Sequence, residues 1–284
     1  MSGIDLICDG HSHSELPEGL QVGETLIAHT GCYRHFLGKV TLDIKNKKII
    51  SKKAELLNAA GVAKLSAPDK KISAAIEKID SDLQKYLDEV VAESDRALTA
   101  ERKFVRHEET ELGNLLADSF KWKAGADIGF LDGGNIRESL PAGKIMRRDV
   151  FAVLPFPNTL VKVEISGKIL HELLEFGLKD YPKMSSVTPH TSGITFSFDC
   201  RKDVGHRVEN IFVGGEVLDE EKMYTLATSD FLANGGDGFT MLKNSKLLET
   251  FDVTNVVVTE YLQKVGIKNI EVGRVKNLNV LPAE

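Results

Sequence analysis

The sequence has no apolar run near the roughly 18 residues that a membrane-spanning helix needs, and no signal peptide precedes its first apolar segment. It also lacks a basic patch to offset its net charge of -6, which argues against polymeric nucleic acid as a partner. Cysteine is scarce, and Cys8, Cys32 and Cys200 are far apart and show no CxxC spacing. The full sequence has 284 residues, of which 42% are hydrophobic and 27% are charged. This length and composition are typical of an ordinary soluble protein of two modest domains.

The first region is rich in predicted strands. Residues 4–8 form an apolar stretch typical of a buried parallel strand, and the chain begins on it with nothing before it to pair with. We therefore interpret the chain as a truncated piece of something larger. Alternating patterns predict strands over residues 25–30, 38–44 and 48–56, with a turn at 45–47, and indicate the end of a β-sandwich.

A long helix is predicted to separate this region from the rest of the chain. Pro68 precedes it, and over residues 71–93 apolar side chains recur at steps of three and four residues, which predicts one amphipathic helix. Its apolar stripe consists of Ile72, Ile76, Ile79, Leu83, Leu87 and Val90. We place the boundary between two domains near this helix.

Beyond the helix, predicted strands and helices are mixed without a strict βαβ repeat, which indicates an α+β fold. The predicted strands span residues 126–131, 159–165, 193–199, 211–217 and 223–228. The predicted helices span residues 112–124, 148–153, 169–177 and 253–265.

The segment 229–239 combines residues that suit a bound ligand. Its three glycines permit positive φ and close backbone approach. They are Gly235, Gly236 and Gly238. Phe231 and Asp237 stand toward its two ends, and an aromatic face beside a carboxylate suits a flat, hydrogen-bonding ligand such as a nucleobase. A hairpin turn with a core phenylalanine would explain the same pattern.

Two histidines, His11 and His13, follow the predicted strand at residues 4–8. Two imidazoles on one loop could both reach a metal ion, although a catalytic centre needs at least three protein ligands. The same spacing is also typical of solvent-exposed histidines. Asp9 and His11 have the DxH spacing that opens metallophosphatases, but no Gly-Asn-His-Glu follows in the sequence.

Three arginines are candidates for binding an anion. Arg102 and Arg106 are four residues apart and would converge on a helix, and Arg137 follows a Gly-Gly turn. A solvated charged segment is the alternative. Phe156 stands between two prolines that stiffen its loop, which suits either a stacking platform or a core position.

Six motifs occur in a fixed order along the second region. They are Arg102 with Arg106, Glu-Leu-Gly-Asn-Leu-Leu-Ala-Asp at 111–118, Gly-Gly-Asn-Ile-Arg at 133–137, Asp-Val-Phe-Ala-Val-Leu-Pro-Phe-Pro-Asn at 149–158, Thr-Ser-Gly-Ile at 191–194, and Asp-Phe-Leu-Ala-Asn-Gly-Gly-Asp-Gly at 230–238. In this order they resemble the C-terminal domain of the 5'-nucleotidase family over about residues 101–251. The first region, with Ile-Cys-Asp-Gly-His-Ser-His, resembles the last strands of the family's N-terminal metallophosphatase domain.

The resemblance implies that Arg102, Arg106 and Arg137 bind the phosphate and ribose side of a nucleotide. Asp132 stands where the family usually has asparagine before Gly-Gly. We expect a carboxylate there to repel phosphate and to shift the preference within the nucleotide.

The resemblance also implies a base pocket. Phe156 and Phe231 would sandwich the base, and the side chain or backbone of three further residues would line it. These residues are Asn158, Gly193 and Asp237.

In the first region, the resemblance implies that His11 and His13 are two ligands of a dinuclear zinc or manganese centre. The family's remaining ligands would precede Met1, so we assign no catalytic residue to this chain. The implied domains are 1–65, a C-terminal remnant of a calcineurin-like metallophosphatase domain, 66–95, a linker helix, and 96–284, the substrate-binding domain.

The implied function is metal-dependent hydrolysis of a nucleoside monophosphate, with this chain recognising the base and the phosphate. One alternative is a nucleotide-binding module that is catalytically incomplete. Another is a 2',3'-cyclic-nucleotide phosphodiesterase with 3'-nucleotidase action, or a nucleotide-sugar hydrolase of the same family. Relatives are commonly periplasmic or extracellular, and the sequence indicates no oligomeric state.

Overall fold

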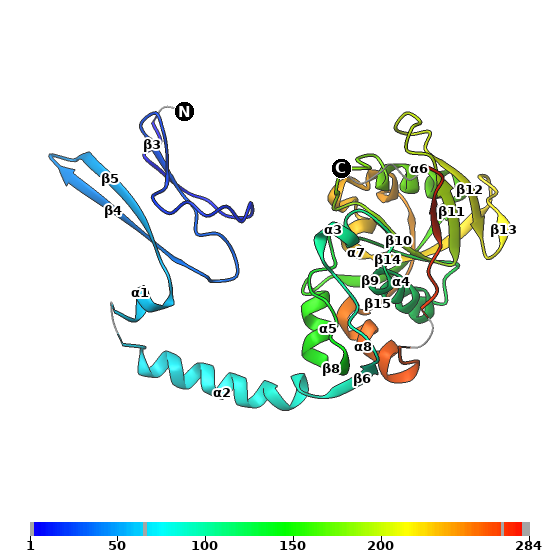
Figure 1. The fold of residues 1–284 in the computed structure, drawn as a ribbon, viewed down its shortest axis with the longest axis horizontal. Helices are drawn as coiled ribbons and strands as arrows, with labels where there is room; N and C mark the ends of the chain where they lie inside the picture. The colour runs from blue at the N-terminus through cyan, green and yellow to red at the C-terminus, as the bar shows by residue number, and fades with distance from the viewer. Residues whose placement is uncertain (1–2, 65–66, 268–269, 280–284) are drawn as a thin grey trace. The chain divides into compact units, whose positions relative to one another are not determined.

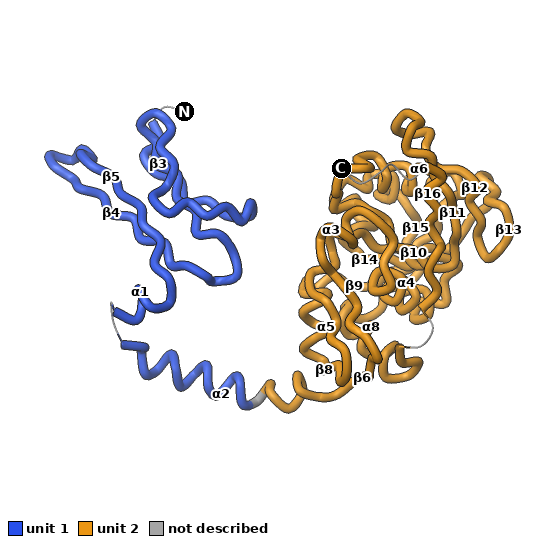
Figure 2. The backbone as a smooth tube through the Cα atoms, in the orientation of Figure 1, with its two compact units in different colours: residues 1–81 blue, residues 82–284 orange. Residues whose placement is uncertain are grey.

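The computed structural model describes residues 3–64, 67–267 and 270–279. The chain forms two compact units, Met1–Ser81 and Asp82–Glu284 (Figures 1 and 2). The division falls inside the predicted linker 66–95. The predicted domain boundary between residues 65 and 66 lies outside the described residues.

Unit 1 holds two small sheets. In the first, β1 (Leu6–Cys8) pairs in parallel with β3 (Thr25–Ala28), which pairs antiparallel with β2 (Leu20–Val22). In the second, β4 (Leu37–Lys45) and β5 (Lys48–Leu57) form the predicted hairpin. A short helix, α1 (Ala59–Ala63), follows.

The predicted turn of this hairpin is confirmed in detail. Asn46 and Lys47 both have positive φ, 51° and 62°, which gives the backbone twist that two-residue hairpin loops favour. The prediction for residues 4–8 is confirmed as a parallel strand but is wrong about burial. In β1 itself Leu6 and Ile7 are only half-buried, and Cys8 is exposed.

The long helix α2 (Lys70–Leu87) ends earlier than the predicted helix at 71–93. Val90 begins a strand, β6 (Val90–Ser94), that pairs with β8 (Gly143–Met146). Asp88 and Glu89 form ion pairs with Arg148 and Arg147 at the start of α5. These tertiary contacts and the β-branched pair at residues 90–91 override the helical periodicity.

Four residues of the predicted apolar stripe on α2 are exposed: Ile72, Ile76, Ile79 and Leu83. Within the described part of the chain, no helix is long and apolar enough to cross a membrane.

Unit 2 is a mixed helix and sheet structure, as predicted for an α+β fold. Its main sheet has the strand order β10-β7-β14-β9-β15. These strands are β10 (Pro189–Ser192), β7 (Ile128–Asp132), β14 (Met223–Ser229), β9 (Thr159–Ser166) and β15 (Lys246–Val253). Only β7 and β14 pair in parallel within this sheet.

A second sheet of unit 2 has the order β13-β12-β11-β16. Its strands are β13 (Glu216–Val217), β12 (Val208–Val213), β11 (Ile194–Phe198) and β16 (Val275–Asn277). The single strand predicted over 211–217 is therefore wrong. Gly214 and Gly215 have positive φ, 59° and 88°, and turn the chain back into a hairpin between β12 and β13.

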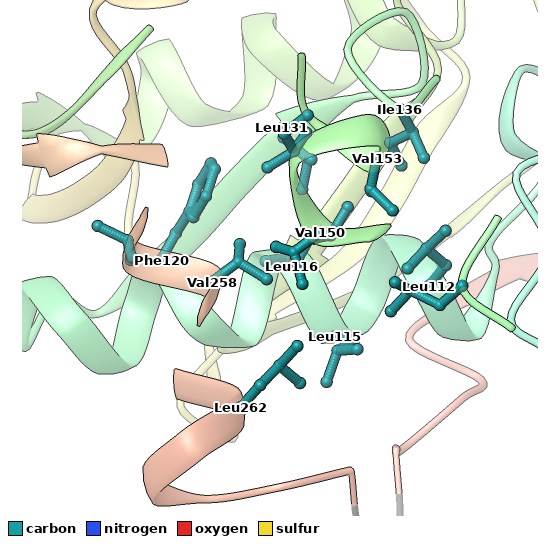
Figure 3. Close-up of a cluster of buried hydrophobic side chains, with 14 of the residues drawn as sticks. Leu112, Leu115, Leu116, Phe120, Leu131, Ile136, Val150, Val153, Val258 and Leu262 are labelled. Atoms are coloured by element: carbon teal, nitrogen blue, oxygen red, sulfur yellow. The ribbon is translucent and has the colours of Figure 1, made fainter. Parts of the chain in front are cut away.

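Two hydrophobic clusters form the core of unit 2. One lies between the main sheet and three helices: α4 (Glu111–Ala124), α5 (Arg147–Val153) and α8 (Thr254–Lys264). Figure 3 shows side chains of these helices meeting in it, among them Leu116, Val150 and Val258. The other cluster includes residues of α6 (Gly167–Gly177), the main sheet and the second sheet.

Candidate functional site

Strand directions bring three segments to one edge of the main sheet. Because β7 and β14 are parallel, the residues that follow both strands emerge at the same edge. Because β9 is antiparallel to β14, with Ser229 opposite Leu160, the segment that precedes β9 is at this edge too. Residues 132–137, 156–158 and 230–238 therefore belong to one site.

A close backbone contact positions the first arginines. Arg102 begins the short helix α3 (Arg102–Val105), and Arg106 caps its end. A Cβ added at Gly133 would lie 1.9 Å from the carbonyl oxygen of Val105, so only glycine allows α3 to approach the turn after β7 this closely. The glycine turn thus places Arg106 beside the end of β7.

The Val105 carbonyl is held from a second side. It lies 2.9 Å from Nε2 of His190 on β10. Burial lowers the pKa of His190 to about 4, so the imidazole is neutral at pH 7 and its Nε2–H donates to this carbonyl. His190 therefore fixes the end of α3 against the sheet.

The three predicted arginines converge. Burial lowers the pKa of Arg106, and the positive charges of Arg102 and Arg137 lower it further, while Asp132 and Asp237 act in the opposite direction. The buried Nε of Arg106 has no hydrogen-bond partner among the described residues. A cluster of guanidinium groups with an unsatisfied buried donor is suited to an anion.

Asp132 at the end of β7 is fully buried. Its Oδ1 accepts a hydrogen bond from Nδ2 of Asn135, whereas its Oδ2 has no donor among the described residues. Burial, with the negative charge of Asp237, raises the pKa of Asp132 to about 8. This raised pKa favours the neutral acid form of Asp132, and the expectation that residue 132 shifts the preference within the nucleotide stays a prediction.

Two aromatic rings stand exposed at the same edge. Phe156 and Phe231 are each 42% exposed, so both rings are open to a flat ligand. The guanidinium of Arg137 lies 5.7 Å from the centre of the Phe156 ring. The alternatives of a core Phe156 and a core Phe231 are both excluded.

A side-chain contact links the segments that carry these rings. Oδ1 of Asp230 accepts hydrogen bonds from the backbone N–H of Thr159, at 3.0 Å, and of Phe231, at 2.8 Å. Asn158 donates from Nδ2 to Oδ1 of Asn135 over 3.4 Å, which ties it to the turn after β7. A hollow of about 470 Å³ is lined by Asn158, Asp230, Phe231, Asn234, Gly235, Gly236 and Lys243.

The glycine loop after β14 has the predicted positive φ at two of its three glycines. Phe231 lies on α7 (Asp230–Ala233), and the loop continues through two short 3-10 helices, η1 (Gly236–Gly238) and η2 (Thr240–Leu242). Gly235 and Gly238 have positive φ, 86° and 92°. Gly236 does not have positive φ. Its lack of a side chain lets the Phe231 ring pack closely against the backbone, since a Cβ there would lie 2.5 Å from the ring.

Gly193 is not part of this site. It follows Ser192, which pairs with Gly129 at the beginning of β7, whereas Asp132 is at the other end of that strand. Three strand residues span about 10 Å. Gly193, with φ 79°, instead forms the corner where the chain passes from β10 of the main sheet to β11 of the second. Its assignment to the base pocket is therefore wrong.

The loop before β10 belongs to the site and was missed by the sequence analysis. The carbonyl of Ser186 accepts a 2.7 Å hydrogen bond from the N–H of Gly134, and the N–H of Ser185 donates to the carbonyl of Arg106 over 2.7 Å. Two serines in a loop carry little signal by themselves. Their role as a bridge between Arg106 and the Gly133–Gly134 turn emerges only from the pairing of β10 with β7.

The predicted metal ligands lie in unit 1. His11 and His13 both have positive φ, 65° and 61°, and His13 packs edge-on against Tyr33 with ring centres 5.7 Å apart. Residues 3–64, 67–267 and 270–279 contain no group of three or more His, Cys, Asp or Glu side chains arranged to hold a metal ion. These two histidines alone do not fit a two-metal centre, which needs more ligands.

Comparison with known proteins decides the family. Residues 90–244 match the family model described as 5'-nucleotidase, C-terminal domain. The chain belongs to the 5'-nucleotidase family. The resemblance inferred from the six motifs is thereby confirmed, and the candidate site lies within the matched residues.

The similar proteins cover between 64% and 99% of this chain. A trifunctional nucleotide phosphoesterase, YfkN of Bacillus subtilis, is 30% identical over 98% of this chain and 20% of its own length. A 5'-nucleotidase of Vibrio vulnificus is 31% identical over 64% of this chain and 32% of its own length. A 5'-nucleotidase precursor from Thermus thermophilus superposes with a TM-score of 0.70 and 28% identity, covering 99% of this chain and 61% of that one. The chain thus spans less than two thirds of each of these proteins.

Proposed function

We propose that this chain supplies base and phosphate recognition to a nucleotidase that hydrolyses nucleoside monophosphates. The observation that carries the proposal is the convergence of three arginines, two exposed phenylalanines and a buried acid at one sheet edge within the family domain. Relatives named nucleotidases and nucleotide phosphoesterases support it.

In this proposal each group has a physical role. The guanidinium groups of Arg102, Arg106 and Arg137 donate forked hydrogen bonds to the phosphate and neutralise its charge. Phe156 and Phe231 stack on the base. Both rings are exposed, so covering them with a flat ligand removes apolar surface from water. Binding both ends of the nucleotide fixes the phosphoester for attack, which is an entropic contribution to catalysis.

In this proposal the chain binds and orients the nucleotide, and its own residues supply no catalytic group. His11 and His13 are proposed as two metal ligands, and the others that a zinc or manganese centre needs would come from a further polypeptide segment. A metal centre of this class would polarise the phosphate and activate a water.

Replacing Phe156 or Phe231 with alanine is expected to weaken adenosine binding by about 1 to 3 kcal/mol, because each change removes one stacking face. Equilibrium titration with adenosine measures the loss. Trp122→Ala is the matched control, since Trp122 is also an exposed aromatic but lies near the end of α4, away from this site. Unchanged affinity in both phenylalanine variants would remove the base-stacking assignment.

The purified chain is expected to bind AMP and to release no phosphate from it when manganese or zinc is supplied. Inorganic phosphate is assayed at saturating AMP, with His11→Ala and the exposed-histidine control His206→Ala measured alongside. Metal-dependent release that His11→Ala abolishes and His206→Ala leaves intact would show that this chain completes a metal centre itself. The division of roles proposed above would then be wrong.

A wider range of phosphoesters is a second candidate function. The name of the Bacillus subtilis relative, trifunctional nucleotide phosphoesterase, favours it. Competition titrations with AMP, a 2',3'-cyclic nucleotide and a nucleotide sugar distinguish the two. Similar affinities for all three would favour the wider range, and strong preference for AMP would favour the nucleotidase.

A further inference from the structure

An aromatic ring from α6 packs against the glycine loop of the candidate site. Phe176 stands near the end of this helix and is half-buried. A Cβ added at Gly238 would lie 2.8 Å from Cζ of Phe176, so the ring lies directly on the loop backbone. The ammonium group of Lys179 lies 3.9 Å from the centre of the same ring, a cation–π contact that further restrains it.

The Phe176 ring belongs to a row of aromatic side chains that runs from α6 to β7. Its centre lies 4.9 Å from the centre of the Phe239 ring, which lies 5.4 Å from that of Phe130 on β7, and both pairs are edge-to-face. Phe130 and Phe239 are fully buried, so neither ring can shift without disturbing the close-packed core. The row therefore fixes Gly238 relative to β7, the strand that ends at Asp132.

Both ends of η1 rest against a phenylalanine. Gly236 packs against Phe231, the proposed stacking partner of the base, and Gly238 packs against Phe176. Asp237 between them has φ 50°, an uncommon value for a residue with a side chain, which persists where the surroundings hold the backbone. The packing of the two rings against η1 thus sets the position of Asp237.

We propose that Phe176 is a positioning residue for base recognition, which holds η1 in the conformation that receives the base. Phe176 does not line the hollow beside Phe231, so it acts through the backbone of Gly238. A loop that is already held in its binding conformation loses less freedom when a ligand binds. The inference rests on the proposed function, which supplies the identity of the ligand.

Removing the Phe176 ring has a predictable consequence for the loop. Without it, Gly238 would lose the contact that restrains its backbone, and glycine permits many other conformations. Asp237 and Phe231 would then have to be ordered when the base binds. The arginines that are proposed to bind phosphate lie on other segments, so the loss should concern the base alone.

Equilibrium titrations with adenosine and with ribose 5-phosphate test the proposal, because only adenosine carries a base. Phe176→Ala is expected to weaken adenosine binding about tenfold and to leave the affinity for ribose 5-phosphate within about twofold of wild type. Phe176→Leu keeps much of the buried volume without the flat ring, and it is expected to show a smaller loss for adenosine alone. The control is Ile169→Ala, since Ile169 packs on the same core cluster from the other end of α6 and should leave both affinities within about twofold.

Hydrogen–deuterium exchange of the ligand-free protein tests the support of the loop itself. The N–H of Phe239 donates to the Gly236 carbonyl over 3.1 Å, and it should exchange faster in Phe176→Ala than in Ile169→Ala. Equal exchange in the two variants, wild-type adenosine affinity in Phe176→Ala, or equal losses for both ligands overturns the proposal. Failure of the wild type to bind adenosine would overturn the proposed function together with this role, whereas the other results leave the proposed function standing.

Discussion

Replacing Gly133 with alanine is expected to lower the free energy of unfolding by about 4 kcal/mol or more, an effect at the upper end for single substitutions. The new Cβ would lie 1.9 Å from the carbonyl oxygen of Val105 and 2.8 Å from its carbonyl carbon, both backbone atoms held in place by His190. The steric clash between the new Cβ and the Val105 carbonyl is relieved only if α3 moves away from β7. The same movement would displace Arg106, so ligand affinity should fall with stability.

Denaturant unfolding of Gly133→Ala measures this effect. The matched control is Gly143→Ala, because Gly143 also lies in unit 2 but its Cβ would meet nothing within 4 Å. Its positive φ of 86° makes a cost of about 1 kcal/mol the expected result for the control. Equal, small losses in the two variants would show that α3 is not tightly packed on the Gly133 turn.

Replacing Arg106 with alanine is expected to weaken AMP binding by about 30- to 1,000-fold, which corresponds to losing a charge-assisted, half-buried contact to phosphate. Stability is expected to be unchanged or higher. In the unliganded protein Arg106 is destabilised by burial and by the charges of Arg102 and Arg137, so its removal relieves both. Opposite effects on affinity and stability are typical of residues retained for binding.

Calorimetric titration with AMP and with adenosine gives the affinity, and thermal unfolding gives the stability of the Arg106→Ala variant. The loss should be much larger for AMP than for adenosine, because only AMP carries the phosphate. Lys121→Ala provides the control, since Lys121 is a cation of unit 2 near the opposite end of β7, beside Gly193. An equal loss for both ligands would place the phosphate elsewhere.

Local pattern predicted most of the elements of unit 2. Thr110 and Gly125 bracket α4 with an N-cap hydrogen bond and a left-handed C-cap, which are signals that a sequence carries directly. The helix predicted over residues 71–93 was wrong at its C-terminal end, where tertiary contacts determine the structure. The ion pairs of Asp88 and Glu89 with α5 and the pairing of Val90 with β8 were invisible to helical periodicity.

The candidate site was predictable to the extent that its residues occur in known motifs. Which end of a strand a residue occupies depends on strand pairing, and for this reason Gly193 was misplaced and Ser186 was missed. The charge of Asp132 depends on burial, which composition and spacing do not give. The roles of the remaining site residues stay predictions that the variants above test.

Hydrogen–deuterium exchange of the full chain with and without saturating AMP tests the central claim most directly, because it locates the ligand without assuming which residues bind it. The account predicts that AMP slows exchange in four segments, residues 102–106, 132–137, 156–158 and 230–238, and leaves the corner at Gly193 unchanged. Protection centred on another part of unit 2, or no protection at saturating AMP, would contradict it.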